Sequence, residues 1–253
     1  MVLPQGFRDS PHFFGQALAW DLAACPLAPS VLLQYVDDLL LCSPSQALSQ
    51  TYTTIFLNFL NSKRYQASQQ KAQLTQTSVT YLGLKIIPTT KALTTDRLSL
   101  LRDLCPPSTG EQILSFLGLT GFFRHCVPNY ASLAKPLYAA TKDTPTGPLS
   151  SETEVQKAFY NIRSALLSSS PLFLPNPNLP YHLYTDKKGG IIFRALIQPA
   201  GPEMLPMTFI SKQLDPTTQR WFPCLCDLAA AASLYANAKK REEIPHHQGI
   251  THL

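Results

Sequence analysis

The chain has 253 residues, of which 45% are hydrophobic and 15% charged, and its formal net charge is +5. A chain of this length can bury a substantial core and hold two or three folding units. No uncharged apolar run approaches the roughly 18 residues of a membrane-spanning helix. The N-terminus also lacks the basic flank and apolar block of a signal peptide. We therefore expect an intracellular, cytoplasmic protein with no membrane partner.

The cysteines show no CxxC pair and no zinc-like Cys/His spacing. We expect reduced thiols, because nothing else in the sequence indicates an oxidising compartment. The six positions are Cys25, Cys42, Cys105, Cys126, Cys224 and Cys226.

The first predicted elements are a helix and a hairpin. Residues 10–24 have the mixed apolar content of a helix, and Ser10-Pro11 supplies a start because proline is tolerated in a first helical turn. Residues 31–42 form an apolar, strand-like run that is broken at its centre by Asp37 and Asp38. Large apolar residues on both sides favour two short strands with this acidic pair at the tip.

Two adjacent carboxylates in an apolar setting suggest a cation. Desolvating an unpaired charge is costly, and buried charges are normally paired or bound to metal. Mg²⁺ prefers oxygen ligands and takes one or two carboxylates together with substrate phosphates. The alternative is a solvated Asp-Asp turn, and the apolar flanks of Asp37 and Asp38 argue against it.

A basic stretch follows the acidic tip. No Asp or Glu occurs between Leu39 and Thr95. Lysine and arginine contacts to phosphate supply the sequence-independent part of nucleic-acid affinity, although a merely solvated basic face is the alternative. Within this interval we predict a helix at 54–60 and a strand at 79–87. The basic residues are Lys63, Arg64, Lys71, Lys85 and Lys91.

From Thr94 onwards the pattern becomes helical, and later it changes to strands. Ser108 to Glu111 and Ser151 to Glu154 resemble capping boxes, and the Pro- and Gly-rich segment 141–150 between them predicts a linker. Phe122 and Phe123 are expected in the core rather than stacked on bases. Three strand-like runs at 181–185, 191–197 and 207–210 precede an Ala-rich helix at about 223–240.

Four short motifs carry a family resemblance. Leu3-Pro-Gln-Gly-Phe7 resembles motif B and Tyr35-Val-Asp-Asp38 resembles motif C of retroviral reverse transcriptases, especially those of gammaretrovirus-like and endogenous-retrovirus Pol proteins. Residues 68–73 are similar to motif D, and residues 81–84 to motif E, the primer grip. Residues 116–137 resemble the family's thumb, and residues 183–224 resemble its connection region.

The resemblance implies an α+β fold in three parts. These are a partial palm at 1–93 and a helical thumb at 94–145, followed by a ribonuclease-H-like connection domain at 151–253. It implies RNA or DNA template-primer and deoxynucleoside triphosphates as partners, and Mg²⁺, or alternatively Mn²⁺, as cofactor. The implied catalytic and metal-binding residues are Asp37 and Asp38; the implied substrate-binding residues are Gln5, Gly6, Tyr35 and Lys71; and the implied primer grip is Tyr81, Leu82 and Gly83.

One family motif has no counterpart here. Motif A carries the third metal-binding aspartate, and Asp9 and Asp21, the acids before Asp37, lie in other contexts. A two-metal clamp with one carboxylate absent is incomplete. The resemblance implies RNA-directed DNA synthesis by two-metal nucleotidyl transfer as the function by descent. Three hypotheses stay open: a residual or partner-completed RNA-directed DNA polymerase, a template-primer binding module without synthesis, and a truncated product that pairs with a fuller Pol chain. Ribonuclease H activity is not expected, because Asp186 is followed by Lys187-Lys188-Gly189-Gly190 without a matching set of acids.

Overall fold

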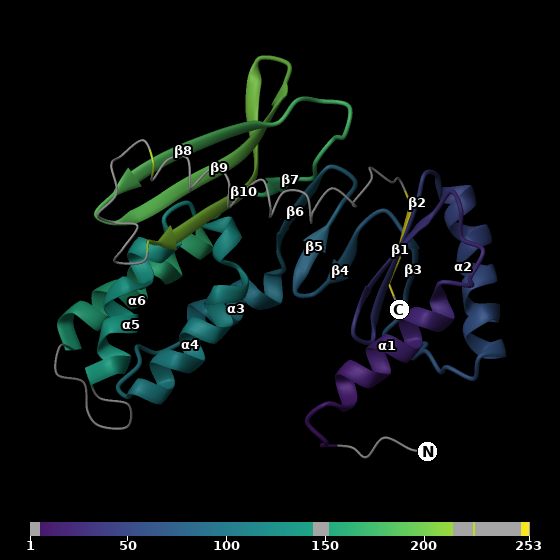
Figure 1. Cartoon of the computed structure of the whole chain (residues 1–253), viewed down its shortest axis with the longest axis horizontal. Helices are drawn as coiled ribbons and strands as arrows, with labels where there is room; N and C mark the ends of the chain where they lie inside the picture. Colours follow the sequence, from purple (N-terminus) through teal and green to yellow (C-terminus); the bar gives the residue numbers. More distant parts are fainter. Residues whose placement is uncertain (1–5, 144–151, 215–224, 226–248, 253) are drawn as a thin grey trace. The chain divides into compact units, whose positions relative to one another are not determined.

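The computed structural model describes residues 6–143, 152–214, 225 and 249–252 (Figure 1). Packing divides the chain into two units, which we call unit 1 (residues 1–91 with 245–253) and unit 2 (residues 92–244). Unit 1 thus combines the N-terminal part of the chain with a short strand from its C-terminal end. The three-part division into 1–93, 94–145 and 151–253 remains a prediction.

Unit 1 contains two helices and a set of short strands. Its elements are α1 (Ser10–Leu22), β1 (Val31–Tyr35), β2 (Asp38–Ser43), α2 (Gln46–Ser62), β3 (Gln73–Gln76), β4 (Val79–Tyr81), β5 (Leu84–Ile86) and β11 (Gly249–His252), with β6 (Thr90–Leu93) spanning the division between units.

The helices of unit 1 begin where the sequence supplies start signals. Pro11 lies in the first turn of α1, as predicted. The hydroxyl of Ser45 caps α2 by accepting a 3.3 Å hydrogen bond from Leu48 N–H. Because its cap lies at Ser45, α2 is longer than the predicted helix at 54–60.

Strand β2 of the β1–β2 hairpin is buried on both faces, because its side chains alternate between two apolar clusters, whereas β1 is only partly buried. Residues 31–35 pair antiparallel with residues 42–38. Leu39 and Leu41 join a core with Leu18 of α1 and Phe56 of α2, whereas Leu40 and Cys42 join a second cluster with Val79 and Tyr81 of β4. Successive strand residues face opposite sides, so β2 is covered on both faces.

The predicted single strand at 79–87 is wrong, because the chain reverses in its middle. β4 and β5 pair antiparallel, with Tyr81 opposite Leu84. The two residues between them, Leu82 and Gly83, have φ of 51° and 74°. Two consecutive left-handed residues define the type I′ turn that suits a two-residue hairpin. The sequence pattern did not indicate this turn, because Gly83 is the only one of its two residues that commonly adopts a left-handed conformation.

Unit 2 begins with helices and continues with a sheet. Its further elements are α3 (Thr95–Asp103), α4 (Gly110–Phe122), η1 (Arg124–Cys126), α5 (Tyr130–Asp143), α6 (Glu152–Leu167), β7 (Leu172–Phe173), β8 (His182–Lys188), β9 (Ile191–Ala200) and β10 (Glu203–Gln213).

The helices of unit 2 pack through aromatic side chains. Phe116 of α4 and Phe159 of α6 lie with ring centroids 4.7 Å apart, and both are buried, as is Phe123. Phe122 is 46% exposed, so its predicted place in the core is wrong. The α4 cap is Thr109, which accepts from Gln112 N–H at 3.3 Å, one residue beyond the predicted start of the capping box.

The sheet of unit 2 has the order β10-β9-β8, with antiparallel pairs throughout. The predicted strand runs at 191–197 and 207–210 fall within β9 and β10, and the run at 181–185 matches β8 except for its first residue. The Gln198 side chain of β9 is buried and secures the loop before β8: its amide donates to Asn176 O at 2.8 Å and Leu179 O at 3.0 Å. The predicted helix at 223–240 lies outside the described residues except for Leu225. Within the described part of the chain, no helix combines the length and apolarity needed to cross a membrane.

The α4–α6 contact yields a stability prediction. Phe159→Ala should lower the free energy of unfolding by about 3–5 kcal/mol, because it removes a fully buried aromatic side chain and leaves a cavity. Phe122→Ala is the matched control and should change the stability by at most about 1 kcal/mol, since nearly half of that side chain is exposed to solvent. Urea denaturation followed by circular dichroism measures both. Equal losses for the two variants would contradict the packing described.

Candidate metal and nucleic-acid site

The acidic pair sits on a strained turn. Val36 and Asp37 form the two-residue turn of the β1–β2 hairpin, which the Tyr35–Asp38 pair closes. Val36 has φ of 55°, a left-handed conformation in which a β-branched residue is an outlier. Such strain costs about 1–3 kcal/mol and gathers at functional sites. The strain therefore supports a specialised role for this turn.

A side chain from β1 braces the turn. Gln34 Nε2 donates to Val36 O and to Gly15 O of α1, both at 3.0 Å. A Cβ placed on Gly15 would lie 4.0 Å from Val36 Cα, so helix and turn approach closely. Sequence reasoning missed Gln34. The available signal was its position as the single amide between Leu33 and Tyr35 in an otherwise apolar strand.

The two carboxylates differ in exposure. Asp37 is exposed and Asp38 is partly buried at the first position of β2. We predicted a bound cation because a carboxylate that is removed from water needs a positive partner. This argument applies to Asp38 more than to Asp37. Tyr35, predicted to line the site, is 53% exposed beside Asp38. The tip thus presents the Asp37 carboxylate and the Tyr35 phenol to solvent, with Asp38 partly buried beside them.

The predicted primer grip lies beside this tip. Tyr81 is buried, and burial raises its pKa to about 12, with the negative charge of Asp38 adding to the shift. Leu82 packs against the cluster that contains Tyr81 and Leu40. The structure therefore brings motifs C and E together within unit 1, with Gly83 at the turn that joins β4 to β5.

The other predicted substrate-binding residues are exposed or lie outside the described residues. Gln5 lies outside the described residues. Gly6 is exposed, has φ of 86°, and a Cβ there would meet no atom within 4 Å. Lys71 is exposed in the turn before β3, where its N–H donates to Ser68 O at 3.2 Å. These features are local, so the assignment of Gly6 and Lys71 to the substrate stays a prediction.

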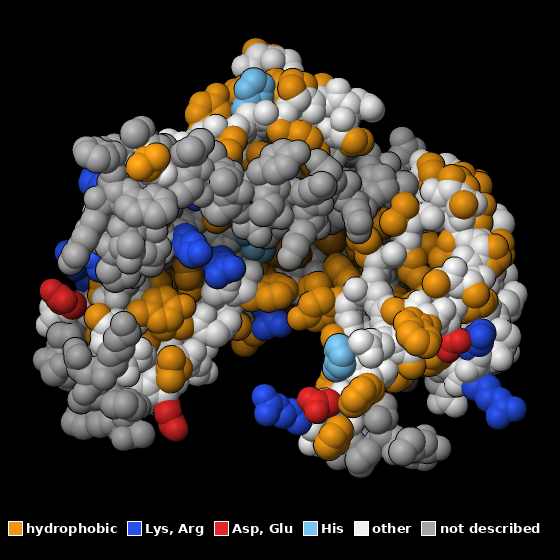
Figure 2. All heavy atoms as spheres, in the orientation of Figure 1, with side chains coloured by type: hydrophobic (Ala, Val, Ile, Leu, Met, Phe, Trp, Pro, Cys, Tyr) orange, Lys and Arg blue, Asp and Glu red, His pale blue; other side chains and the backbone are white. Residues whose placement is uncertain are grey.

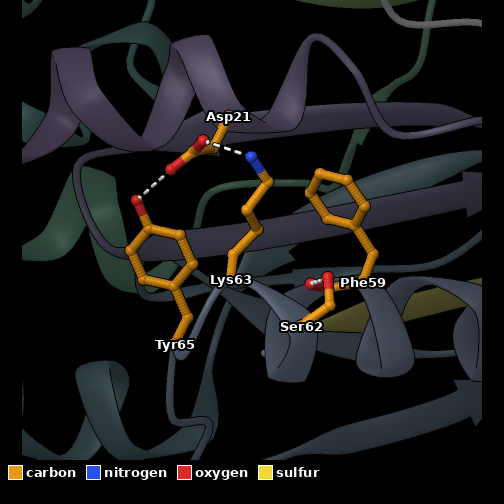
Figure 3. Close-up of polar contacts among 5 residues, drawn as sticks. All are labelled: Asp21, Phe59, Ser62, Lys63 and Tyr65. Atoms are coloured by element: carbon orange, nitrogen blue, oxygen red, sulfur yellow. Dashed lines mark hydrogen bonds and ion pairs between the residues drawn. The ribbon is translucent and has the colours of Figure 1, made fainter.

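Asp21, the acid closest before the tip, is engaged elsewhere. Its carboxylate accepts hydrogen bonds from Lys63 Nζ at 2.9 Å and Tyr65 OH at 2.8 Å. Figure 3 shows both side chains reaching Asp21 from the end of α2 and the segment after it. The hydrogen bond from Lys63, followed by that from Tyr65, lowers the pKa of Asp21. Asp21 therefore ties α1 to α2 as an ion pair.

The described residues hold no cluster of three or more His, Cys, Asp or Glu side chains suited to a metal ion. Asp37 and Asp38 offer a two-carboxylate set. Their oxygens suit Mg²⁺, which commonly binds one or two carboxylates and keeps several waters. The donor chemistry of the tip thus fits the predicted cofactor, with ligand positions left over for phosphates and water.

One cation of the basic stretch forms an ion pair, and three of the others are exposed. Lys63 pairs with Asp21. Arg64, Lys71 and Lys85 are exposed, and Lys91 is partly buried. Phosphate binding within unit 1 would rest mainly on the three exposed cations.

Asp186 in unit 2 has a local partner. It lies exposed in β8, and its Oδ1 accepts from Lys187 N–H at 2.7 Å. Of the next acids along the chain, Glu203 begins β10, and Asp215 and Asp227 lie outside the described residues.

Comparison with protein families first defines the class. Residues 1–86 match the family described as reverse transcriptase (RNA-dependent DNA polymerase). Residues 152–242 match the RNase H-like domain found in reverse transcriptase. The chain thus combines a reverse transcriptase region with an RNase H-like region, in the order that the motifs predict.

The particular lineage follows from individual relatives. The chain is 42% identical to the Gag-Pol polyprotein of Baboon endogenous virus (strain M7) over 240 residues, which is 94% of this chain and 14% of that protein. It is 41% identical to the Pol polyprotein of Feline endogenous virus ECE1, again over 94% of this chain and 23% of that protein. The chain belongs to the retroviral Pol reverse transcriptase family. It spans less than a quarter of the length of these two relatives.

Solved structures share the fold. The foamy viral protease-reverse transcriptase dRH in complex with double-stranded DNA matches with a TM-score of 0.79 at 23% identity, over 95% of this chain and 42% of that one. The foamy viral enzyme in complex with an RNA/DNA hybrid matches with a TM-score of 0.78 at 24% identity, over 93% of this chain and 31% of that one. The predicted α+β fold is confirmed.

The bracing of the turn leads to a mutational prediction. Gln34→Ala removes two hydrogen bonds and should destabilise the chain by about 1–3 kcal/mol, since each contributes about 0.5–1.5 kcal/mol. Gln50→Ala, on the exposed side of α2, is the matched control and should stay within about 0.5 kcal/mol of the parent. Urea denaturation distinguishes them. A Gln34 variant as stable as the control would show that the turn holds without its brace.

The Asp21 ion pair predicts a pH dependence. A lowered pKa means that the carboxylate stabilises the fold above its ordinary value of 3.8, and that this contribution is lost as the pH falls through the lower folded value. Burial and Asp21 raise the pKa of Tyr65, so its contribution is present below 10.0 and is lost as the pH rises through the higher folded value.

Thermal unfolding of the parent and Asp21→Asn between pH 2 and pH 7 measures the acid side. The melting temperatures of the two proteins should converge as the pH falls towards 2, because the parent then loses the charge that the variant lacks. A difference that stays constant over this range would contradict a role for the ionised carboxylate.

Proposed function

We propose that this chain binds template-primer duplex at the β1–β2 and β4–β5 hairpins, with Asp37 and Asp38 as its metal-binding carboxylates. The observation that carries the proposal is the strained turn that holds Asp37 exposed and Asp38 partly buried, next to Tyr81 of the predicted primer grip. The reverse transcriptase match over residues 1–86 contains both hairpins. The relatives of known structure were solved in complex with double-stranded DNA and with an RNA/DNA hybrid.

The carboxylate pair would hold Mg²⁺, or Mn²⁺ in its place. When bound, the ion supplies positive charge that neutralises phosphate oxygens of a deoxynucleoside triphosphate or of the primer end. Asp37 and Asp38 orient it, because the hairpin beneath them is buried on both faces of β2. Tyr35 lies beside Asp38, where its exposed ring would contact an incoming substrate.

Binding rather than synthesis is the activity we assign to this chain acting alone. Two-metal catalysis clamps both the attacking and the leaving oxygen, and the described residues contain no third acid grouped with Asp37 and Asp38. Asp21 is committed to Lys63 and Tyr65. Synthesis would need a carboxylate from another chain or from outside the described residues.

Binding to a labelled RNA/DNA hybrid measures the first half of the proposal. The affinity should fall steeply with salt, by a slope of roughly 0.7–0.9 per phosphate contact in log-log form. The double variant Lys71→Ser/Lys85→Ser should lower that slope by about 1–2. Lys157→Ser/Lys212→Ser, in unit 2, is a charge-matched control. Absence of binding at low salt, or identical slopes for the two double variants, would contradict the proposed site.

Primer extension on an RNA template with Mg²⁺ or Mn²⁺ tests the second half. We expect the parent chain alone to give no extension. In the absence of metal, Asp37→Asn/Asp38→Asn should bind the duplex as the parent does. The divalent ion should strengthen binding by the parent but not by this variant. Extension that the variant loses would instead establish an autonomous polymerase. Extension that appears only with a fuller Pol chain would establish a partner-completed enzyme.

A further inference from the structure

The strand β11 occupies a gap in the sheet of unit 1. The strand order is β1-β2-β11-β3, and β11 runs antiparallel to both of its neighbours. It pairs with Ser43 to Leu40 on β2 through residues 249–252, and with β3 through Ile250 opposite Gln76 and His252 opposite Gln73. β2 and β3 are therefore parallel to each other and two strand spacings apart, about 10 Å.

Nothing in the local sequence produces this gap. β1 and β2 are joined by a two-residue turn, whereas β11 reaches the sheet from the far end of the chain. β3 joins the sheet through β11, and Thr75, between its two paired positions, has φ of 54°. A left-handed residue matches the shift of register between Ile250 and His252. The irregular β3 edge is thus adapted to a strand placed opposite it.

The edge of β2 that faces β11 needs a pairing strand more than a solvent-exposed sheet edge does. Leu39, Leu40 and Leu41 are at most 5% exposed, so the backbone between them is shielded on both faces. A buried N–H or C=O without a partner costs about 1–3 kcal/mol, and an apolar edge that is left open pairs with other chains. A strand in the gap removes both problems at once.

From these observations we infer that the gap between β2 and β3 is a strand-acceptor site, and that Gly249–His252 fills it in cis as an intramolecular ligand. The ligand class is an extended peptide that runs antiparallel to both edges. This strand is only four residues long, shorter than the usual five or six, and it depends on its tether for occupancy. An equivalent peptide supplied in trans therefore competes for the same site.

The register provides a direct test in the full chain. Ile250 is the Cα partner of Cys42, and paired antiparallel residues lie about 4.5–5.5 Å apart, within disulfide range. Ile250→Cys should therefore form an intramolecular disulfide with Cys42 under diamide at pH 8.5. Peptide mapping by mass spectrometry identifies the bond.

Thr251→Cys is the matched control. It lies opposite Leu41, and successive strand positions face opposite sides, so its cross-link to Cys42 should be at least ten times less abundant. Equal yields for the two variants, or none for Ile250→Cys, would overturn the inferred register. A covalent dimer joined through positions 42 and 250 would overturn occupancy in cis.

Displacement tests the acceptor site itself. A fluorescent peptide of residues 246–253 should bind the full-length Ile250→Pro chain at least tenfold more tightly than the parent, because proline in the tethered strand removes a ladder N–H and vacates the site. The same peptide carrying proline at position 250 should bind neither chain. Equal binding to parent and Ile250→Pro would overturn the site.

The disulfide variant keeps the test decisive if Ile250→Pro fails to fold. Peptide binding to Ile250→Cys should be lost on oxidation and restored by dithiothreitol, because the cross-link locks the tethered strand in place. Binding that is indifferent to the redox state would place the peptide elsewhere. Neither experiment requires polymerase activity, so failure of the proposed function would leave these outcomes unchanged.

Discussion

The organisation of unit 1 depends on the enclosure of a single strand, β2. One face of the strand packs on α1 and α2 through Leu39 and Leu41, and the other packs on β4 through Leu40 and Cys42. Its edges pair with β1 and β11. Burial raises the pKa of the Cys42 thiol to about 11, which matches a strand shielded from water. The position of Asp38, the first residue of β2, is set by this enclosure.

The β1–β2 and β4–β5 hairpins both use turns that strain a non-glycine residue. Val36 and Leu82 have φ of 55° and 51°, conformations that cost L-residues about 1–2 kcal/mol. Leu82 packs its side chain against the cluster around Leu40 and Tyr81, a contact that glycine would lose. At Val36 the backbone carbonyl accepts a hydrogen bond from Gln34, which holds the turn whatever side chain the residue carries. The strain is offset by packing in one case and by bracing in the other.

The sequence allowed the β1–β2 hairpin, α1 and the strands of unit 2 to be predicted, because period and turn chemistry are local signals. It did not reveal the β4–β5 reversal, since Leu82 is an unusual residue for a left-handed turn. Gln34 was missed because its two acceptors lie on the turn and on α1. The place of β11 depends on pairing between segments some two hundred residues apart along the chain, for which no local pattern exists.

The exposure of Asp37 would separate the proposed metal binding from folding. In a structural metal site the ligands come together only when the ion is bound, so binding free energy is folding free energy. Here Leu39, Leu40 and Leu41 bury the strand beneath Asp37 and Asp38 through apolar contacts, and Asp37 is exposed. The carboxylates are held in place by apolar packing, and their affinity for a cation can remain weak enough to depend on the phosphates that arrive with it. The proposed site would therefore respond to substrate, while the hairpin beneath it rests on apolar packing.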